Sequence, residues 1–132
     1  MPVMEGTRGL KVAVGEYDFA VDGGTVGTKV LRSAPGDSNG NEIPAGSVIL
    51  GGYIEVDTAV LSATGTVAVQ AQAAADVLAA TGQAGLTVGR KDVIPVWTGS
   101  TSLKTTAVRN ITIVVATAAL TAGKFRVVLF YR

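Results

Sequence analysis

The sequence predicts an all-β protein: one antiparallel β-sandwich domain, jelly-roll-like, with one short helix near residues 73–81. Apolar and polar residues alternate with a period of two along most of the chain, which is typical of strands with one buried face. Glycine-rich turn signals separate these short runs. At 132 residues the chain is long enough to bury one core. We therefore assign residues 17–132 to the sandwich and residues 1–16 to an N-terminal arm or first strand.

The first alternating runs are "LKVAVG", residues 10–15, and "YDFAVD", residues 17–22. The first run fits an extended arm and an ordinary first strand equally well. In the second run Tyr17, Phe19 and Val21 share one face, which predicts a half-buried strand. The glycine pair that follows predicts a turn.

The run "SVILGGYIEVD", residues 47–57, predicts a further strand. Strict alternation places four apolar residues on one face: Val48, Leu50, Ile54 and Val56. Gly51 and Gly52 interrupt the run, and glycine inside a strand predicts a bulge or a close backbone approach.

The middle of the chain changes character after the strand predicted at "TVAVQAQ", residues 66–72. The next stretch, "AAADVLAATGQAG", breaks the alternation, and its Ala, Leu and Asp content favours a helix over residues 73–81 that ends at Gly82. The charge cluster "RKD", residues 90–92, predicts a solvated turn or a polar contact at the rim of an interface.

The last two runs, "NITIVVAT" and "KFRVVLFYR", are rich in β-branched and aromatic residues, and the short connection between them predicts a hairpin. Both are apolar on both faces, unlike a strand with one face in water. Either another part of the sandwich covers the outer face, or neighbouring copies of the chain do. On the second interpretation the candidate self-association residues are Val114, Val128 and Phe130.

The composition excludes most familiar catalytic sites. The chain has no Cys and no His, so it lacks thiolate nucleophiles, the usual zinc ligands and the side chain that titrates near neutral pH. The net charge is +1 with scattered charges, so we expect no nucleic-acid partner, and no apolar run is long enough for a membrane span. We expect no enzyme activity and no cofactor. Only 16% of the residues are charged, which favours an oligomer.

One loop, "PGDSNGNEIPAG", resembles a calcium loop in the spacing of its oxygen ligands: Asp37, Asn39, Asn41 and Glu42. The template requires glycine at the position of Glu42 and a bidentate glutamate at the position of Val48, so the match fails where it is specific. The Asn-Gly pair favours a turn instead. Asp37 and Glu42 remain only weak metal candidates.

Two aromatic residues, Trp97 and Tyr53, suggest an alternative function. Exposed rings on a sandwich stack on sugars, so these residues, with the Asp37 loop, would suit a small carbohydrate-binding module. Single aromatic residues in strands also serve as core or interface anchors.

Four blocks cover most of residues 17–132: "YDFAVDGGTVGTKVLRS", "IPAGSVILGGYIEV", "AAADVLAAT" and "RNITIVVATAALTAGKFRVVLFYR". Their order and spacing resemble the small head decoration proteins, also called capsid-stabilising or cement proteins, of tailed bacteriophages. The resemblance implies a protein without enzyme activity that binds the outside of an assembled shell, often as a trimer, and clamps neighbouring major capsid subunits. It implies a homotrimer on the outer capsid surface of the virion. The N-terminal residues contain no apolar run of the signal-peptide type, so we expect synthesis in the host cytoplasm.

The segment before Tyr17 is similar to the N-terminal arm that such proteins can extend over a neighbour. Leu10, Val12 and Val14 are therefore the candidate capsid contacts. A tail or head-fibre structural module is an alternative virion role, because such components share this composition.

Overall fold

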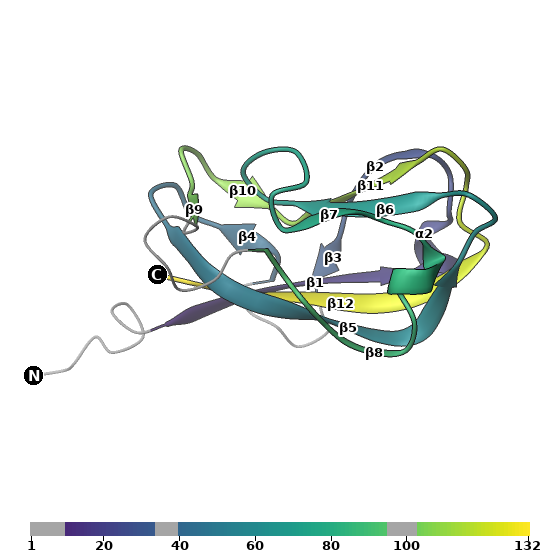
Figure 1. The fold of residues 1–132 in the computed structure, drawn as a ribbon. Coiled ribbons are helices and arrows are strands. Elements are labelled where there is room, and N and C mark those ends of the chain that lie inside the picture. The colour runs from purple at the N-terminus through teal and green to yellow at the C-terminus, as the bar shows by residue number, and fades with distance from the viewer. Residues whose placement is uncertain (1–9, 34–39, 95–102) are drawn as a thin grey trace, which may run out of the picture.

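The computed structural model describes residues 10–33, 40–94 and 103–132. In chain order the elements are β1 (Lys11–Asp18), α2 (Phe19–Asp22), β2 (Gly27–Val30), β3 (Arg32–Ser33), β4 (Glu42–Ile43), β5 (Val48–Leu61), β6 (Thr66–Gln70), β7 (Leu78–Thr81), the 3₁₀ turn η1 (Gln83–Gly85), β8 (Gly89–Asp92), β9 (Leu103–Lys104), β10 (Arg109–Asn110), β11 (Thr112–Ala116) and β12 (Ala122–Tyr131). Figure 1 shows two layers of strands, one above the other.

The lower layer in Figure 1 is a six-stranded sheet in the order β3-β1-β12-β5-β8, with β9 also pairing with β5. The upper layer is a four-stranded sheet in the order β2-β11-β6-β7, and β10 and β4 form a further two-stranded pair. Every pair among the described strands is antiparallel. The prediction of an all-β sandwich is therefore confirmed, while the jelly-roll connectivity stays a prediction.

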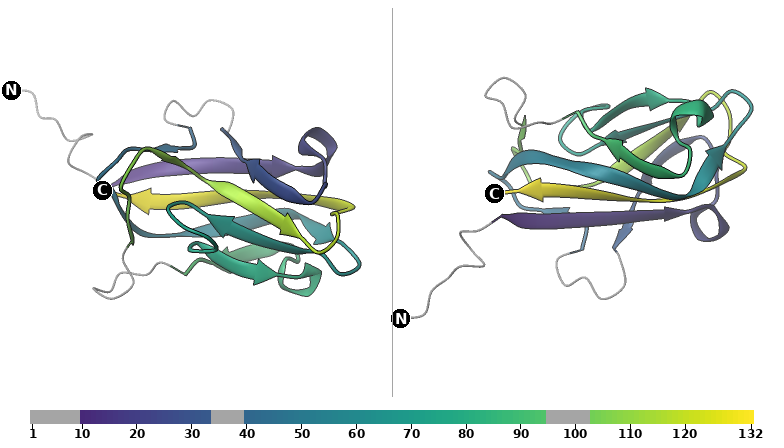
Figure 2. Two further views of the ribbon diagram at one scale, coloured as in Figure 1. Left: turned by 90° about the horizontal axis from the view of Figure 1, so that it is seen from above. Right: turned by 60° about the horizontal axis from the view of Figure 1, so that its bottom comes forward.

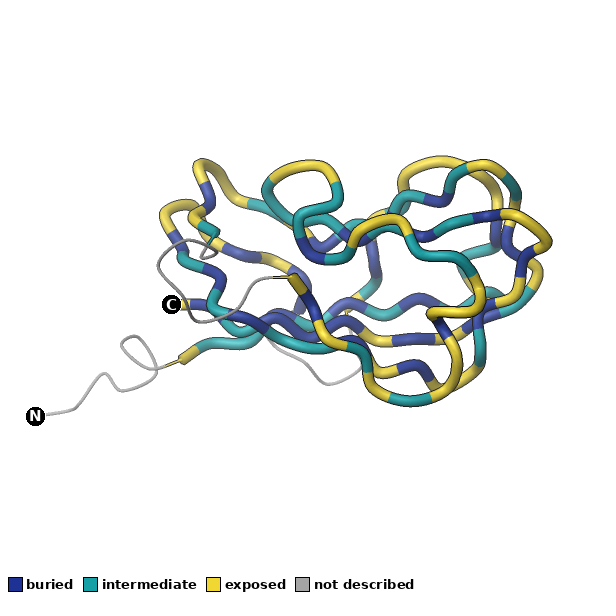
Figure 3. Tube along the Cα trace, viewed as in Figure 1, coloured by how far each residue is buried: buried dark blue, intermediate teal, exposed yellow. Residues whose placement is uncertain are grey.

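The core lies between the two sheets. Buried and half-buried residues alternate along β1 and β6, as a period of two requires, and Figure 3 shows the burial along the chain. The rings of Tyr17 and Phe125 pack with centroids 5.1 Å apart. Around them lie further fully buried side chains: Ile43, Ile49, Ile54, Val67, Ile111, Ile113 and Leu129. Each such side chain contributes about 1.5–3 kcal/mol on burial, so this layer is the main source of stability.

The bulge predicted in β5 is present. The register between β12 and β5 shifts at this point, because Phe130 pairs with Gly51 whereas Tyr131 pairs with Ile49. A side chain on Gly52 would meet the carbonyl oxygen of Val128 at 2.0 Å, so only glycine allows this backbone approach.

Because of the same bulge, the prediction for the residues that precede it is wrong: they do not share the buried face of Ile54 and Val56. Ile49 is fully buried, whereas Val48 and Leu50 are only half-buried. The extra residue changes the side-chain parity along the strand. Ile54 and Val56 lie in the core as predicted.

The strand predicted over residues 17–22 ends at Asp18, where the single helical turn α2 begins. The Asp18 carboxylate accepts a hydrogen bond from the Ala20 amide, and the Asp22 carboxylate accepts one from the Asp18 amide. Both are local side-chain-to-backbone bonds, which compete with the sheet ladder. Val21, predicted to be buried, is consequently 65% exposed.

The helix predicted over residues 73–81 is wrong. The Asp76 carboxylate accepts hydrogen bonds from three successive amides, those of Ala71, Gln72 and Ala73, at 2.8, 2.9 and 2.5 Å. These bonds close a compact loop, and β7 then pairs with β6. The local carboxylate bonds and the sheet pairing override the helix propensity of alanine.

The predicted final hairpin is also wrong. β11 pairs with β2 and β6 in the four-stranded sheet, whereas β12 pairs with β1 and β5 in the other sheet. The connection crosses between the layers and is held by the Leu120 amide on the Gly24 carbonyl and the Thr121 amide on the Leu61 carbonyl, both at 2.8 Å. Two runs that are apolar on both faces therefore lie in different sheets.

Candidate interaction surface

The outward face of the six-stranded sheet carries a band of apolar side chains. Residues directly opposite each other in an antiparallel pair point to the same face. Val14 lies opposite Val128, which lies opposite Tyr53, and in the next row Val12 lies opposite Phe130. We call these five residues the apolar band. Val128 is only 5% exposed and the other four are half-buried.

Aromatic contacts hold the band together. The rings of Tyr53 and Phe130 lie 6.2 Å apart between centroids, in a tilted arrangement. The guanidinium carbon of Arg90 lies 5.4 Å from the centroid of the Tyr53 ring, within the range of a cation–π contact. Since one neighbour is apolar and the other is cationic, the Tyr53 ring joins the apolar band to the charged residues beside it.

A row of alternating charges runs across the same face, next to the apolar band. The strand register places Arg32 opposite Glu16, Glu16 opposite Arg126, Arg126 opposite Glu55, and Glu55 opposite Arg90. We call these five residues the charged ladder. Its central link is an ion pair between Arg126 and Glu16, with 2.6 Å between Nη2 and Oε1. The hydrogen bond to Glu16 raises the pKa of Arg126, which stays cationic.

The ladder ends in a polar corner formed by α2. Arg32 Nε donates to the Asp22 carboxylate at 2.9 Å, and the hydrogen bond raises the pKa of Arg32. The Tyr17 hydroxyl donates to the Gly23 carbonyl at 2.7 Å. Burial, followed by the charges of Asp22 and Asp18, raises the pKa of Tyr17 to about 12. The corner therefore holds a phenol that stays neutral at neutral pH and anchors a turn.

The outward face of the four-stranded sheet has a different chemistry. Its directly opposed residues carry no charge, and most are small: Thr28, Val30, Thr66, Ala68, Gln70, Thr112, Val114 and Ala116. We call them the uncharged face. Val114 therefore lies on the opposite side of the sandwich from Val128 and Phe130, although the sequence analysis grouped all three as self-association residues.

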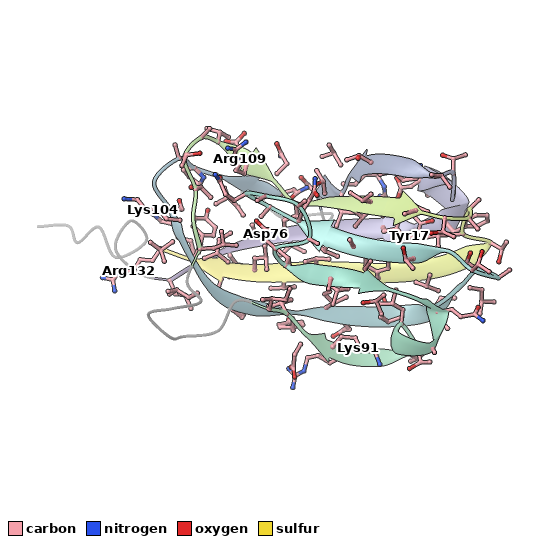
Figure 4. The ribbon with its side chains drawn as sticks, turned by 45° about the horizontal axis from the view of Figure 1, so that its top comes forward. Tyr17, Asp76, Lys91, Lys104, Arg109 and Arg132 are labelled. Carbon is pink, nitrogen blue, oxygen red and sulfur yellow. The ribbon has the colours of Figure 1, made fainter. Side chains whose placement is uncertain are left out.

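A second polar cluster ties a loop to the β9–β10 segment. Gln72 Oε1 accepts hydrogen bonds from Arg109 Nε at 2.8 Å and from the Thr106 amide at 3.2 Å, and Gln72 Nε2 donates to Thr106 Oγ1 at 2.9 Å. Asp76 organises the same loop. Figure 4 places Asp76 and Arg109 toward one end of the sandwich and Tyr17 toward the other.

Two of the four candidate ligands of the suspected calcium loop, Asp37 and Asn39, lie outside the described residues, so the weak metal site stays a prediction. Glu42 is exposed in β4. Asn41 is buried, and its side chain bonds to the backbone of Leu31 and Ile111. Among the described residues no three Asp or Glu side chains gather in a way that could hold a metal ion.

Of the two aromatic residues considered for sugar binding, Trp97 lies outside the described residues. Tyr53 lies within β5, packed between Phe130 and Arg90. Of these two rings, the described residues therefore include one, and sugar binding stays a prediction.

The structure unites two groups of residues that the sequence analysis had separated. Val12 and Val14, suggested as capsid contacts, lie directly beside Phe130 and Val128, suggested for self-association. Leu10, at the edge of this group, is 49% exposed. Residues 90–92 belong to the edge strand β8, so the solvated turn predicted there is wrong. Cross-strand pairs such as Glu16 and Arg126, which are 110 residues apart, leave no local signal in the sequence.

Comparison with known proteins places this fold among solved viral structures. No protein-family model matches the chain, and no curated protein sequence matches it significantly. A chain of the Cyanophage Pam1 capsid asymmetric unit is similar over 92% of this chain and 83% of that chain, with a TM-score of 0.61 and 23% identity. A chain of the acidic stable capsid of Helicobacter pylori bacteriophage KHP30 is similar over 92% and 86%, with a TM-score of 0.61 and 14% identity. At these identities the likeness shows the fold.

In the described part of the chain, none of the helices has the length and apolar character that crossing a bilayer requires.

Proposed function

We propose that the chain is a structural protein of a phage particle, without enzyme activity, that binds the outer surface of the capsid as an oligomer and stabilises the shell. One observation carries the proposal: the sandwich recurs over 92% of this chain in two structures of phage capsids. The resemblance of the four sequence blocks to head decoration proteins supports the same role independently.

The surface chemistry suits a protein that works by contact. The six-stranded sheet has a mixed apolar and charged outward face, and the four-stranded sheet has an uncharged one. Two ion pairs among the described residues join neighbouring elements of the fold, Arg126 with Glu16 and Arg32 with Asp22. When the charges of a broad face are already paired with one another, binding another protein removes little unpaired charge from water, so the desolvation cost of binding is small.

Binding to the assembled shell would stabilise it by mass action. A protein that binds the shell but not its dissociated subunits stabilises each occupied site by RT ln(1 + [L]/Kd), about 2.7 kcal/mol at 100 times Kd. The proposed partner is the major capsid protein, with the exposed Leu10 as the candidate contact. A homotrimer that touches several capsid subunits at once would gain avidity through effective concentration.

The test uses shells assembled from the major capsid protein of the same phage, prepared with and without this chain. We expect decorated shells to melt or burst at a higher temperature than bare shells. Equal temperatures, with the chain bound at saturation, would contradict the stabilising role.

A second measurement addresses the mechanism. The chain, labelled with a fluorophore, is titrated with intact shells and, separately, with dissociated capsid subunits. We expect binding to shells and at least ~100-fold weaker binding to subunits, since equal affinity for both states shifts no equilibrium. Equal affinities would rule out the linkage mechanism.

A further inference from the structure

We infer that the outward face of the six-stranded sheet, formed by the apolar band and the charged ladder, joins copies of this chain to one another. The inference rests on the oligomer in the proposed function and names its contact surface. It differs from the sequence analysis, which had divided these residues between the shell and a second copy.

The composition of this face is that of an interface. Its apolar band contains two aromatic side chains, Tyr53 and Phe130, and two arginines, Arg90 and Arg126, lie beside it. Aromatic residues and arginine are the residues most enriched in interface hot spots. No described strand or helix packs against this face. The residues of the core cluster point to the other side of the sheet. Figure 2 (right) turns this side of the sandwich toward the viewer.

The charges of the face are complementary to a second copy of themselves. Across the five strands the order is Arg32, Glu16, Arg126, Glu55 and Arg90, so the signs alternate and read the same from either end. If a second copy packs on this face with a displacement of one strand, about 4.8 Å, each overlapping carboxylate lies opposite a guanidinium group. This holds whether the strand order of the second copy runs in the same or in the reverse direction. This is the charge complementarity that sets partner choice and register.

The area is also sufficient. The face spans the eight residues of β1, similar lengths of β12 and β5, the four residues of β8 and the two of β3. With strands about 4.8 Å apart and about 3.3 Å per residue, its projected area is roughly 480 Å² before side-chain relief. This is the same order as the ~800 Å² per partner of a stable interface.

The uncharged face is the weaker candidate for this contact. It presents threonine, alanine, valine and one glutamine, and it contributes neither an aromatic ring nor an arginine from the residues that define it. Small side chains of this kind are under-represented among hot spots. It therefore serves as the matched control.

The test compares Val14→Lys with Val114→Lys. Both valines are half-buried in mid-strand and point outward, but from opposite sheets. The mass of each purified variant is measured by analytical ultracentrifugation at tens of micromolar, without shells. We expect the wild type and Val114→Lys to have a multiple of 13.3 kDa, and Val14→Lys to associate at least ~30-fold more weakly and to approach 13.3 kDa.

Circular dichroism checks that each variant is folded. If Val14→Lys unfolds, Glu55→Lys decides, because Glu55 is exposed and the substitution puts like charges opposite each other across copies. A monomeric wild type, or an unchanged mass for the folded band or ladder variant, would overturn the inference. Dissociation by Val114→Lys alone would assign the contact to the uncharged face.

Binding to shells separates the inference from the proposed function. A Val14→Lys variant that keeps its mass but no longer binds shells would show that this face meets the capsid, so the inference fails and the function stands. A wild type that self-associates through this face but leaves shells bare would contradict the function alone.

Discussion

Asn41 offers the most direct test of how the two layers are held together. It is 4% exposed, and its side-chain amide donates to the carbonyls of Leu31 and Ile111 at 2.8 and 2.9 Å and accepts from the Ile111 amide at 2.6 Å. Replacement by alanine leaves the Leu31 carbonyl and the Ile111 amide without these bonds. The Ile111 carbonyl keeps its bond from the Leu31 amide. Two unsatisfied buried groups at about 1–3 kcal/mol each predict a loss of roughly 2–6 kcal/mol.

Chemical denaturation of Asn41→Ala measures this loss, since a domain of this length has a stability of only about 7–20 kcal/mol. Asn110→Ala is the matched control, because Asn110 is exposed and donates only a long bond of 3.4 Å to the Asn41 carbonyl. We expect the control to change stability by less than ~0.5 kcal/mol. If Asn41→Ala costs less than ~1 kcal/mol with an unchanged denaturant slope, the reasoning about this buried amide is wrong.

Three further predictions follow from single residues. The folded chain holds the Tyr17 proton up to a pKa of about 12, whereas the unfolded chain releases it near 10, so the contribution of Tyr17 to the free energy of unfolding is complete below pH 10 and is lost as the pH rises toward 12. Tyr17→Phe should flatten this part of the curve of stability against pH, and an unchanged curve would contradict the assignment. Gly52→Ala should lower the free energy of unfolding by at least ~3 kcal/mol, because the added Cβ would clash with the Val128 carbonyl oxygen. Gly82→Ala should be neutral or stabilising by up to ~1 kcal/mol, because the nearest atom to its added Cβ is 4.0 Å away. Similar losses at both positions in denaturant unfolding would be inconsistent with a local clash. Asp76→Ala should cost about 1.5 kcal/mol and speed hydrogen exchange in its loop, and unchanged exchange would show that the three amide bonds do not hold the loop.

The alternation of residues identified the fold class because side chains in a half-buried strand must alternate. It placed Tyr17, Ile54 and Val56 correctly in the core. Gly51 and Gly52 also marked a true bulge, because glycine inside a strand usually signals a close backbone approach. The sequence did not reveal that the bulge moves the residues before it to the other face of the strand, because an extra residue leaves no signature of its own in the alternation.

The errors have a common cause, which is that pairing partners lie far apart in the chain. Alanine-rich residues 73–81 have high helix propensity, but the carboxylate of Asp76 and the pairing of β7 with β6 decide their structure. The runs of β11 and β12 are adjacent in sequence and still enter different sheets. Local propensity contains no information about such long-range pairing.

The candidate surface was predictable residue by residue but not as an arrangement. Val12, Val14, Val128 and Phe130 were all singled out from the sequence, yet only the β1–β12 register brings them together. Of the charged ladder only Arg90 was singled out, as a possible contact at the rim of an interface, because the members of the ladder come from five strands spread over the chain.

A cryo-EM reconstruction of purified phage particles tests the central claim most directly. The account predicts density for this sandwich on the outer surface of the capsid, in clusters of copies that contact one another and the major capsid protein. Density for the sandwich in the tail or a head fibre, or particles of full stability that lack the chain, would contradict it.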